Sequence, residues 1–496
     1  MAVLSETLAK AQPCLAHHPV PRAVVGAEAW KQAAQALAEG RMTLLGLWGE
    51  HDAAHMAVRD TEEGSIAVLS LLCPNGRFPS VGAVHPPAVR LERTMRDLYG
   101  LIADGAKDTR PWLDHGKWPH SRAEARAPYD FLPAEGENLH HIVVGPVHAG
   151  IIEPGNFRFT AGGETIVRLE ERLGYVHKGI EGLMAGADLK RGAQLAGRTS
   201  GDSTVAYAFA FARAAEAALG CEVPPRAVWL RALMAELERL ANHFGDIGAI
   251  CNDAAFALMH AHTGVLRELV LRTCDAAFGH RLMRDGIVPG GVAHDLDDRG
   301  VAAIRALLAE ARRRFPPLVK LYDDTASLQD RTVGTGRLSP ELARQYGAGG
   351  FVGRASGRNF DARRDLVYAP YDQLHFTVPI RNDGDVNARV WIRIHEVEQS
   401  LGLIEQILDR LPAGPITVPL PIGSDACEGL ALVEGFRGDV LVWLHLNREG
   451  TIARCHLRDP SWFQWPLLEA AIEGNIVADF PLCNKSFNCS YSGHDL

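Results

Sequence analysis

The sequence predicts an α+β protein, with a small N-terminal α/β domain followed by a large, mainly helical bundle that carries small peripheral β-sheets. Three observations lead to this prediction. Long segments after residue 200 repeat apolar residues every three or four positions, which is typical of helices. Short apolar or alternating stretches near both ends of the chain have the pattern of strands. A polar stretch with two prolines separates the first part of the chain from the rest.

Residues 1–120 are predicted to form the small α/β domain, and residues 121–138 the linker that follows it. The stretches 41–60 and 64–74 alternate or run apolar between turn residues, so each is predicted to contain strands. A helix is predicted within 86–105 from the helical spacing of Leu91, Met95, Leu98 and Leu101 or Ile102. The linker is polar and contains two prolines and a glycine.

Residues 139–496 are predicted to form the second, larger domain. Glycine and proline punctuate the segment 139–176, which predicts one or two β-hairpins. The segment 203–220 is apolar on nearly all sides and is predicted to be a buried helix. An alternating pattern predicts a strand, a turn and a second strand over 438–463. Four more segments have helical spacing, namely 224–249, 261–283, 298–325 and 386–412.

The composition limits the possible functions. The chain has 496 residues, a net charge of −9 and no long basic block, which argues against a nucleic-acid partner. No stretch approaches the ~18 to 20 consecutive apolar residues that a transmembrane helix needs. The N-terminal residues lack the basic start and the apolar core of a signal peptide. We therefore expect a cytoplasmic protein that reaches a membrane only through a partner.

The nine cysteines are scattered and form no C-x-x-C pair. In a long cytoplasmic chain this distribution predicts reduced and mostly buried thiols, and we expect this of at least seven. The C-terminal stretch DFPLCNKSFNCSYSGHDL contains Cys483, Cys489, His494 and Asp495. Because no paired cysteines supply a second half-site, the spacing argues against a zinc site there.

The loop GPVHAGIIEPG, residues 145–155, is the first candidate for chemistry. It is framed by glycine and proline, and it carries His148 and Glu153. A histidine and a carboxylate in such a loop can relay protons near neutral pH. The alternative is a structured turn with a surface histidine and a salt-bridged glutamate, and the residues alone favour this alternative.

The stretch AGRTSGDSTVAYAFA is the second candidate, because Arg198, Ser200, Asp202 and Ser203 precede an apolar helix. Ordinary helix N-capping accounts for Asp202 or Ser203. It does not account for so polar a cluster beside so apolar a segment, and the alternative is a lined cavity. Further along, the segment 354–364 contains four arginines that could hold anions or pair with carboxylates. Their expected use is structural, as a bridge between the sheet and helix layers or to a partner subunit.

Several blocks of the chain resemble one family. They include LERTMRDLYG, GPVHAGIIEPG, LGYVHKGIEGLM, ELERLANHFGDIG and NIVADFPLCNKSF, in this order along nearly the whole sequence. The chain resembles the large subunits of group 4 membrane-bound nickel–iron hydrogenases of the formate hydrogenlyase type, which are homologous to the 49-kDa subunit of respiratory complex I. LERTMRDLYG resembles the 30-kDa subunit of complex I, which is fused at the N-terminus in such hydrogenases.

The resemblance implies where metal ligands would lie. These hydrogenases hold nickel and iron through the motifs R-x-C-G-x-C and D-P-C-x-x-C. The corresponding positions here are Ser200, Ser203, Ser490 and Gly493, and Cys489 lies one place before an expected cysteine. A serine hydroxyl stays protonated near neutral pH and is a harder ligand than a thiolate. We therefore expect no bound metal, no directly bound cofactor and no hydrogen turnover, with Cys489 as a buried remnant.

The chain ends at Leu496, where the resemblance places the last residue before the cleaved extension of metal-bearing relatives. A protein that takes up no nickel needs no removable extension. The C-terminal stretch is therefore interpreted as a vacated metal site.

Complex I lacks these cysteines as well, and in its 49-kDa subunit the cavity became part of the quinone site. Its quinone-binding tyrosine corresponds to Gly201 and its histidine to Ile152, whereas His148 matches an earlier histidine of the same loop. Glu153 matches a glutamate that the hydrogenases use for proton transfer. The resemblance thus implies a quinone or proton cavity lined by His148, Glu153, Arg198 and Asp202.

The residues and the resemblance leave three functions open. The first is a metal-free subunit of a membrane-associated, complex I-like oxidoreductase complex. It would pass electrons from a small iron–sulfur subunit, which holds the cluster, towards quinone, or couple redox chemistry to ion translocation. The second is a non-catalytic scaffold that docks the iron–sulfur subunit on antiporter-like and other membrane subunits. The third, an active hydrogenase with unusual ligands, fits least. The expected location is the inner face of the cell membrane.

Overall fold

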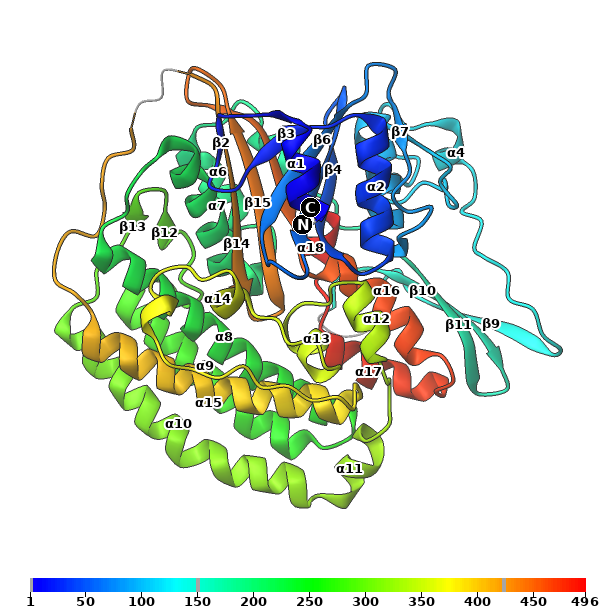
Figure 1. Ribbon diagram of the computed structural model, residues 1–496. Coiled ribbons are helices and arrows are strands. Elements are labelled where there is room, and N and C mark those ends of the chain that lie inside the picture. Colours follow the sequence, from blue (N-terminus) through cyan, green and yellow to red (C-terminus); the bar gives the residue numbers. More distant parts are fainter. Residues whose placement is uncertain (1–2, 149–151, 422–424) are drawn as a thin grey trace.

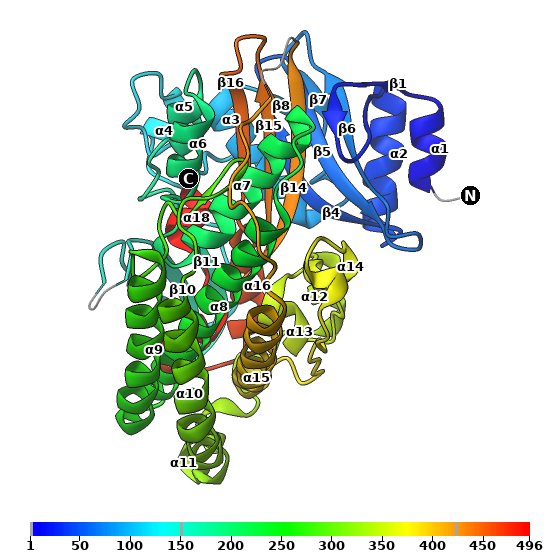
Figure 2. The same ribbon diagram turned by 90° about the vertical axis from the view of Figure 1, so that its left-hand side faces the viewer.

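The computed structural model describes residues 3–148, 152–421 and 425–496. The strands predicted within 41–60 and 64–74 are confirmed, and they belong to a five-stranded sheet with the order β1-β3-β6-β5-β4. The helix α2 packs on this sheet, with α1 against α2 (Figure 2). The elements of this part are α1 (Val3–Ala9), β1 (Gln12–Pro13), β3 (Arg22–Val24), α2 (Ala27–Ala38), β4 (Met42–Gly49), β5 (Ala53–Asp60) and β6 (Ile66–Leu72).

The helix predicted within 86–105 is α3 (Val89–Tyr99), which ends earlier than its apolar spacing indicates. Gly100 adopts a left-handed conformation with a φ of 74°, and this conformation ends the helix. The chain then forms β8 (Ile102–Asp104), which pairs in parallel with β7 (Arg77–Pro79). The prediction that Leu101 and Ile102 continue the helix is therefore wrong.

The long helices predicted after residue 200 are confirmed, and four of them pack against one another in the lower half of Figure 1. These four are α8 (Pro225–Asp253), α9 (Ala257–Phe278), α10 (Asp298–Asp324) and α15 (Val386–Arg410). The fifth, α7 (Thr204–Leu219), is buried along most of its length, as predicted. Within the described part of the chain, none of the helices combines the length and the apolar character that a bilayer span requires.

A four-stranded sheet lies between α7 and the N-terminal sheet (Figure 2). α7 packs on β14 and β15, and Trp48 of the N-terminal sheet contacts Trp443 on the other side. The N-terminal part and the rest of the chain therefore share a hydrophobic core. The predicted domain boundaries remain a prediction. The sheet has the order β16-β15-β14-β2, formed by β2 (His17–His18), β14 (Cys427–Gly435), β15 (Gly438–Leu446) and β16 (Ile452–Arg458).

A three-stranded sheet extends from the body of the molecule at the right of Figure 1, and it confirms the predicted hairpins within 139–176. It consists of β9 (Leu139–Val144), β10 (Asn156–Gly162) and β11 (Thr165–Arg172). The strands β15 and β16 confirm the strand, turn and strand predicted within 438–463. The mixture of long helices and small sheets confirms the predicted α+β fold class.

Short elements connect these parts. The strands β12 (Ile287–Val288) and β13 (Gly291–Val292) form a separate pair. The shorter helices are α4 (Ala123–Arg126), α5 (Ile180–Met184), α6 (Leu189–Ala196), α11 (Ala326–Thr332), α12 (Pro340–Gln345), α13 (Gly350–Ala355), α14 (Ala362–Asp365), α16 (Ser461–Ile472), α17 (Phe480–Phe487) and α18 (Tyr491–Asp495).

Buried ion pairs join the helices to the four-stranded sheet. Arg354 lies 2.6 Å from Glu396 and 2.9 Å from Glu434, and Arg363 lies 2.9 Å from Glu236. Burial alone would raise the pKa of Glu396, but its cationic neighbours, Arg354 first among them, hold that pKa well below the usual value. The expectation that arginines of the segment 354–364 pair with carboxylates is confirmed for these two.

Candidate functional site

Three of the four positions that the resemblance assigns to metal ligands meet in one cluster. Ser200 and Ser203 lie just before α7, whereas Ser490 caps α18 by accepting a hydrogen bond from the Gly493 amide at 2.9 Å. The Ser200 and Ser490 hydroxyl oxygens are 2.9 Å apart, although the two residues are 290 positions apart in the chain. The structure therefore brings the two predicted half-sites together.

We define the serine cluster as Ser200, Asp202, Ser203 and Ser490. Arg437 lies beside it and contacts Asp202 and Ser203. Ser200 donates to the Asp202 carboxylate at 2.9 Å, and Arg437 donates to both carboxylate oxygens at 2.7 and 2.6 Å. Burial alone would raise the pKa of Asp202, but the Arg437 guanidinium outweighs it and lowers that pKa. Each hydroxyl of the cluster has a hydrogen-bond partner, so the cluster is self-contained.

Sequence reasoning missed Arg437, which sits in the turn between β14 and β15. The side chain is only 5% exposed, while that of Asp202 is 35% exposed. An arginine between two apolar strands is the signal that could have identified it, because a buried guanidinium requires an anionic partner.

Gly493 lies at the fourth predicted ligand position, and the space around it is filled. A Cβ atom added there would lie 2.4 Å from a carboxylate oxygen of Asp459 and 2.9 Å from the Ser490 hydroxyl. The same Asp459 oxygen accepts a hydrogen bond from Tyr207 at 2.6 Å. A side chain at position 493 would therefore have to displace a carboxylate that α7 holds in place.

All nine cysteines are free thiols, and six of them, Cys489 included, are buried. Burial raises the pKa of the Cys489 thiol well above its usual value, so this sulfur stays protonated at neutral pH. The sulfur lies 4.0 Å from the side-chain amide oxygen of Gln464. The predicted burial of Cys489 is confirmed, and the protonated sulfur is a poor ligand for a metal ion.

A cavity of about 260 Å³ lies next to the serine cluster, on the far side of Cys489 and Tyr491. We call it the His148 cavity. Both ring nitrogens of His148 are buried and have no hydrogen-bond partner among the residues that the structure describes. Its ring faces Phe157 at a centroid distance of 5.5 Å. The walls are mainly apolar and aromatic, with Lys485 among the polar groups.

Tyr491 is a second polar group of the His148 cavity that sequence reasoning missed. Its hydroxyl oxygen is buried and forms no hydrogen bond of good geometry within the described chain, although the Asn484 side chain lies beside it. Burial raises the pKa of this hydroxyl, so it remains a donor at neutral pH. Tyrosine is common in apolar cores, and only the fold reveals that this one shares a cavity with His148.

Two of the predicted site residues have other contacts. Glu153 accepts a hydrogen bond from the Ser492 amide at 3.0 Å, which ties the loop to α18 beside the serine cluster. Arg198 lies in a bidentate pair with Asp285, with distances of 2.6 and 2.8 Å, and its side chain is 36% exposed. The structure thus brings His148, Glu153 and Asp202 to one region, whereas the charge of Arg198 is directed to Asp285.

Comparison with known proteins relates both parts of the chain to subunits of respiratory complexes. Residues 253–422 match the family model of the respiratory-chain NADH dehydrogenase 49-kDa subunit, and residues 23–128 match that of the 30-kDa subunit. The chain is 33% identical over 439 residues to formate hydrogenlyase subunit 5 of Escherichia coli, covering 84% of this chain and 77% of that protein.

Two further relatives agree. An NADH-quinone oxidoreductase subunit of Syntrophobacter fumaroxidans is 32% identical over 355 residues, which cover 71% of this chain and 95% of that protein. A solved chain of the membrane-bound sulfane sulfur reductase, an archaeal respiratory membrane complex, has a TM-score of 0.69 and 25% identity. The match covers 72% of this chain and 99% of the solved chain. The chain therefore belongs to the family of complex I 49-kDa subunits and related hydrogenase large subunits, with a 30-kDa-subunit domain fused at its N-terminal side.

Proposed function

We propose that the chain is a metal-free redox subunit of a membrane-associated, complex I-like complex, and that a quinone headgroup binds in the His148 cavity. Electrons would arrive from an iron–sulfur cluster in a partner subunit. The observation that carries the proposal is the buried imidazole of His148, which has no hydrogen-bond partner among the described residues and shares its cavity with the buried Tyr491 hydroxyl. A quinone has two carbonyl oxygens, and each can accept one hydrogen bond from such a donor.

The chemistry of the serine cluster supports the metal-free part of the proposal. A nickel–iron pair needs soft thiolate ligands, and the four corresponding positions offer three neutral hydroxyls and a glycine. The Arg437 guanidinium lies 3.1 Å from the Ser203 hydroxyl, so a positive charge already lies beside the cluster and would repel a metal cation. These residues do not fit a nickel–iron pair.

The relatives support the redox role at a coarser level. They are subunits of hydrogenase and NADH-quinone oxidoreductase complexes, and one of them is named for its reaction with quinone. The binding of quinone by this chain is our own inference, because the tyrosine and the histidine of its cavity occupy other positions than those that the resemblance assigns to the clamp of complex I.

A scaffold function is the second candidate, and the surface beside the His148 cavity favours it. Val147 is 82% exposed and Ile152 is 38% exposed, which places apolar side chains on the outside of the loop that follows β9. Apolar groups gathered on one surface are typical of an interface with another protein. We expect the iron–sulfur subunit to dock here under either function.

Rates of quinone reduction in the assembled complex, driven by its own electron donor, distinguish the two functions. Loss of one hydrogen bond to a bound headgroup costs about 1.4 kcal/mol, or about tenfold. We therefore expect Tyr491→Phe, which removes a donor, to lower the rate about tenfold. His148→Gln keeps an N–H donor but cannot deliver a proton to the reduced quinone, and we expect a loss of at least about tenfold. Tyr175→Phe is the matched control, because Tyr175 lies outside the cavity and is 37% exposed.

Co-purification of the partner subunits with each variant checks that the complex has assembled. Unchanged rates for His148→Gln and Tyr491→Phe in fully assembled complexes would contradict quinone binding in this cavity and favour the scaffold. A loss of assembly on replacing Val147 with Asp, without a change in the fold of the isolated chain, would support the expected docking surface.

A further inference from the structure

A second, more apolar cavity lies between the N-terminal part and the rest of the chain. Its volume is about 300 Å³, within the range of small-molecule sites. One wall comes from β4 and α3, with Leu47 and Met95, and the opposite wall from β16, α16 and the segment that leads into α5. We call it the interdomain cavity.

The lining shows that the interdomain cavity is a pocket and not a surface groove. Leu47 is 1% exposed, Met95 is 2% exposed and Trp462 is 3% exposed, yet all three border the empty space. Trp48 and Tyr99 add aromatic surface to the same walls. A space enclosed by side chains this deeply buried fits a small molecule better than a segment of another protein.

Glu181 pairs with cationic neighbours at one end of the interdomain cavity. Glu181 lies 2.8 Å from Arg454 and 2.9 Å from His456, and it also accepts the amide of Leu457. Burial alone would raise the pKa of Glu181, but Arg454 and His456 lower it to about 2. The Glu181 carboxylate is therefore ionised and paired at neutral pH. Asp495, which also borders the cavity, accepts hydrogen bonds from the Gly174 and Val176 amides.

Two glycines border the interdomain cavity and leave part of its edge without a side chain. Gly179 and Gly182 both border the cavity, and a Cβ atom added at either would meet no atom within 4 Å. Gly182 lies inside the short helix α5 with an ordinary backbone conformation, so a larger residue can replace it without backbone strain. Position 182 is thus a place from which the cavity can be blocked.

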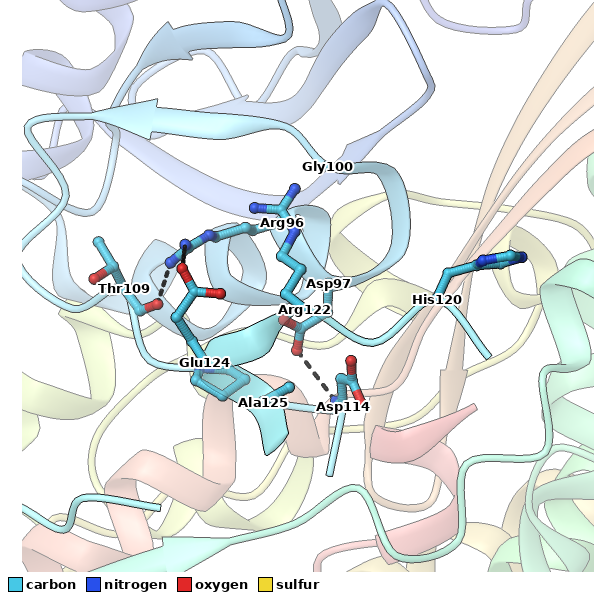
Figure 3. Close-up of a pocket in the computed structure, with 10 residues that line it drawn as sticks. Arg96, Asp97, Gly100, Thr109, Asp114, His120, Arg122, Glu124 and Ala125 are labelled. Carbon is cyan, nitrogen blue, oxygen red and sulfur yellow. Dashed lines mark hydrogen bonds and ion pairs between the residues drawn. The ribbon is translucent and has the colours of Figure 1, made fainter. Parts of the chain in front are cut away.

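A polar pocket of about 200 Å³ at the end of α3 provides the contrast (Figure 3). There Arg96 points towards Glu124 and donates to the Thr109 carbonyl oxygen, and Asp97 accepts the Asp114 amide. Its charged groups are directed at one another and at the backbone, and it has little apolar wall. We find no ligand class that this pocket favours.

We propose that the interdomain cavity binds a neutral, largely apolar small molecule with an aromatic ring. Its walls offer aromatic and aliphatic contact, the carboxylates of Glu181 and Asp495 are held by protein groups, and Gly182 leaves part of its border without a side chain. Because its two walls come from the N-terminal part and from the rest of the chain, such a ligand would hold the two together. The proposal is independent of quinone binding in the His148 cavity.

Binding of N-phenyl-1-naphthylamine, a neutral aromatic probe whose fluorescence rises in apolar surroundings, tests the proposal on the full-length chain. We expect saturable binding of one probe per chain. Gly182→Phe is expected to weaken it at least tenfold, because the added ring enters the cavity from its edge. Gly264→Phe is the matched control, since Gly264 is also a helical glycine with open space above it and borders none of the described cavities.

A further variant distinguishes binding in the interdomain cavity from binding in the His148 cavity. His148→Gln alters the other cavity, so we expect it to leave probe binding unchanged. Gly182→Leu is a smaller obstruction and replaces Gly182→Phe if circular dichroism shows that the latter does not fold. The proposal is overturned by the absence of saturable binding, by equal affinity in the folded Gly182 variant and the control, or by loss of binding in His148→Gln.

Discussion

The serine cluster and the His148 cavity lie next to each other and differ in one respect. In the cluster, every hydroxyl and carboxylate has a partner, from the Gly493 amide through Ser490 and Ser200 to Asp202 and Arg437. In the cavity, the imidazole of His148 has none among the described residues. Polar groups that satisfy one another stabilise a fold, whereas a buried polar group without a partner leaves room for a water molecule, an ion or a ligand. We therefore propose that the positions matched to metal ligands contribute to stability and that the cavity is the functional part.

Removing Asp202 is the strongest test of the structural role of the cluster. Asp202→Ala leaves the Arg437 guanidinium buried without its carboxylate, which we expect to cost about 2–3 kcal/mol. We expect a smaller loss of stability than for a fully buried ion pair, because the Asp202 side chain is 35% exposed and water can reach the pair. Urea-induced unfolding measures the loss. Combining Asp202→Ala with Arg437→Met should recover part of the stability, and a double variant weaker than Asp202→Ala would contradict the pairing.

Glu238, which accepts the Val205 and Ala206 amides at the start of α7, adds a pH dependence. Burial raises the pKa of Glu238 to about 8, against an ordinary value of 4.5. The folded chain thus keeps a proton that the unfolded chain releases, so this stabilisation is complete below pH 4.5 and is lost as the pH rises through 8. We expect a loss on the order of 2 kcal/mol between pH 5 and 7.

The Glu238→Gln variant checks this assignment, because its side chain does not titrate. Unfolding midpoints in urea at pH 5 and pH 7 should differ less for Glu238→Gln than for the unmodified chain. Equal pH dependence in the two proteins would show that Glu238 is ionised throughout.

Filling the fourth ligand position is expected to have a smaller effect. Gly493→Ala places a methyl group 2.4 Å from the Asp459 carboxylate, and such overpacking costs about 1–2 kcal/mol. Thermal unfolding detects the change. Gly201→Ala is the control, since a Cβ atom at Gly201 meets nothing within 4 Å. A Gly493→Ala chain as stable as the control would mean that the site is roomier than described.

The smallest change concerns the serine pair itself. Ser200→Ala removes the hydroxyl between Ser490 and Asp202, and we expect a loss of about 1 kcal/mol in stability. The quinone reduction rate of the assembled complex should stay the same, in contrast to His148→Gln. If Ser200→Ala lowers the rate as much as His148→Gln does, the separation between cluster and cavity fails.

Much of the helical framework could be predicted from the sequence, because the long helices bury one apolar face at regular spacing. The α3 helix shows the limit, since the apolar residues Leu101 and Ile102 continue its pattern beyond Gly100, where the left-handed backbone ends the helix. Burial also follows composition, as the buried Cys489 shows.

The candidate site could be predicted only in part. The motif positions located Ser200 and Ser490, but not their contact with each other, which depends on how α18 meets the start of α7. The place of Arg437 between two apolar strands indicates a buried guanidinium but not its partner Asp202, which is distant in the chain. No local pattern distinguishes Tyr491 from other core tyrosines, because only the fold brings it to the cavity of His148. Arg198 is the opposite case, in which a residue beside the cluster in the sequence has its charged group elsewhere. Its guanidinium contacts Asp285, and its place next to Ser200 in the sequence does not reveal this.

Nickel and iron analysis of the freshly purified chain tests the central claim most directly, after any proposed iron–sulfur partner has been removed. The serine cluster, with its hydroxyl donors and the Arg437 cation, predicts only background nickel in this chain. One nickel per chain, retained through dialysis against a chelator and lost in a Ser200→Ala variant, would contradict the account.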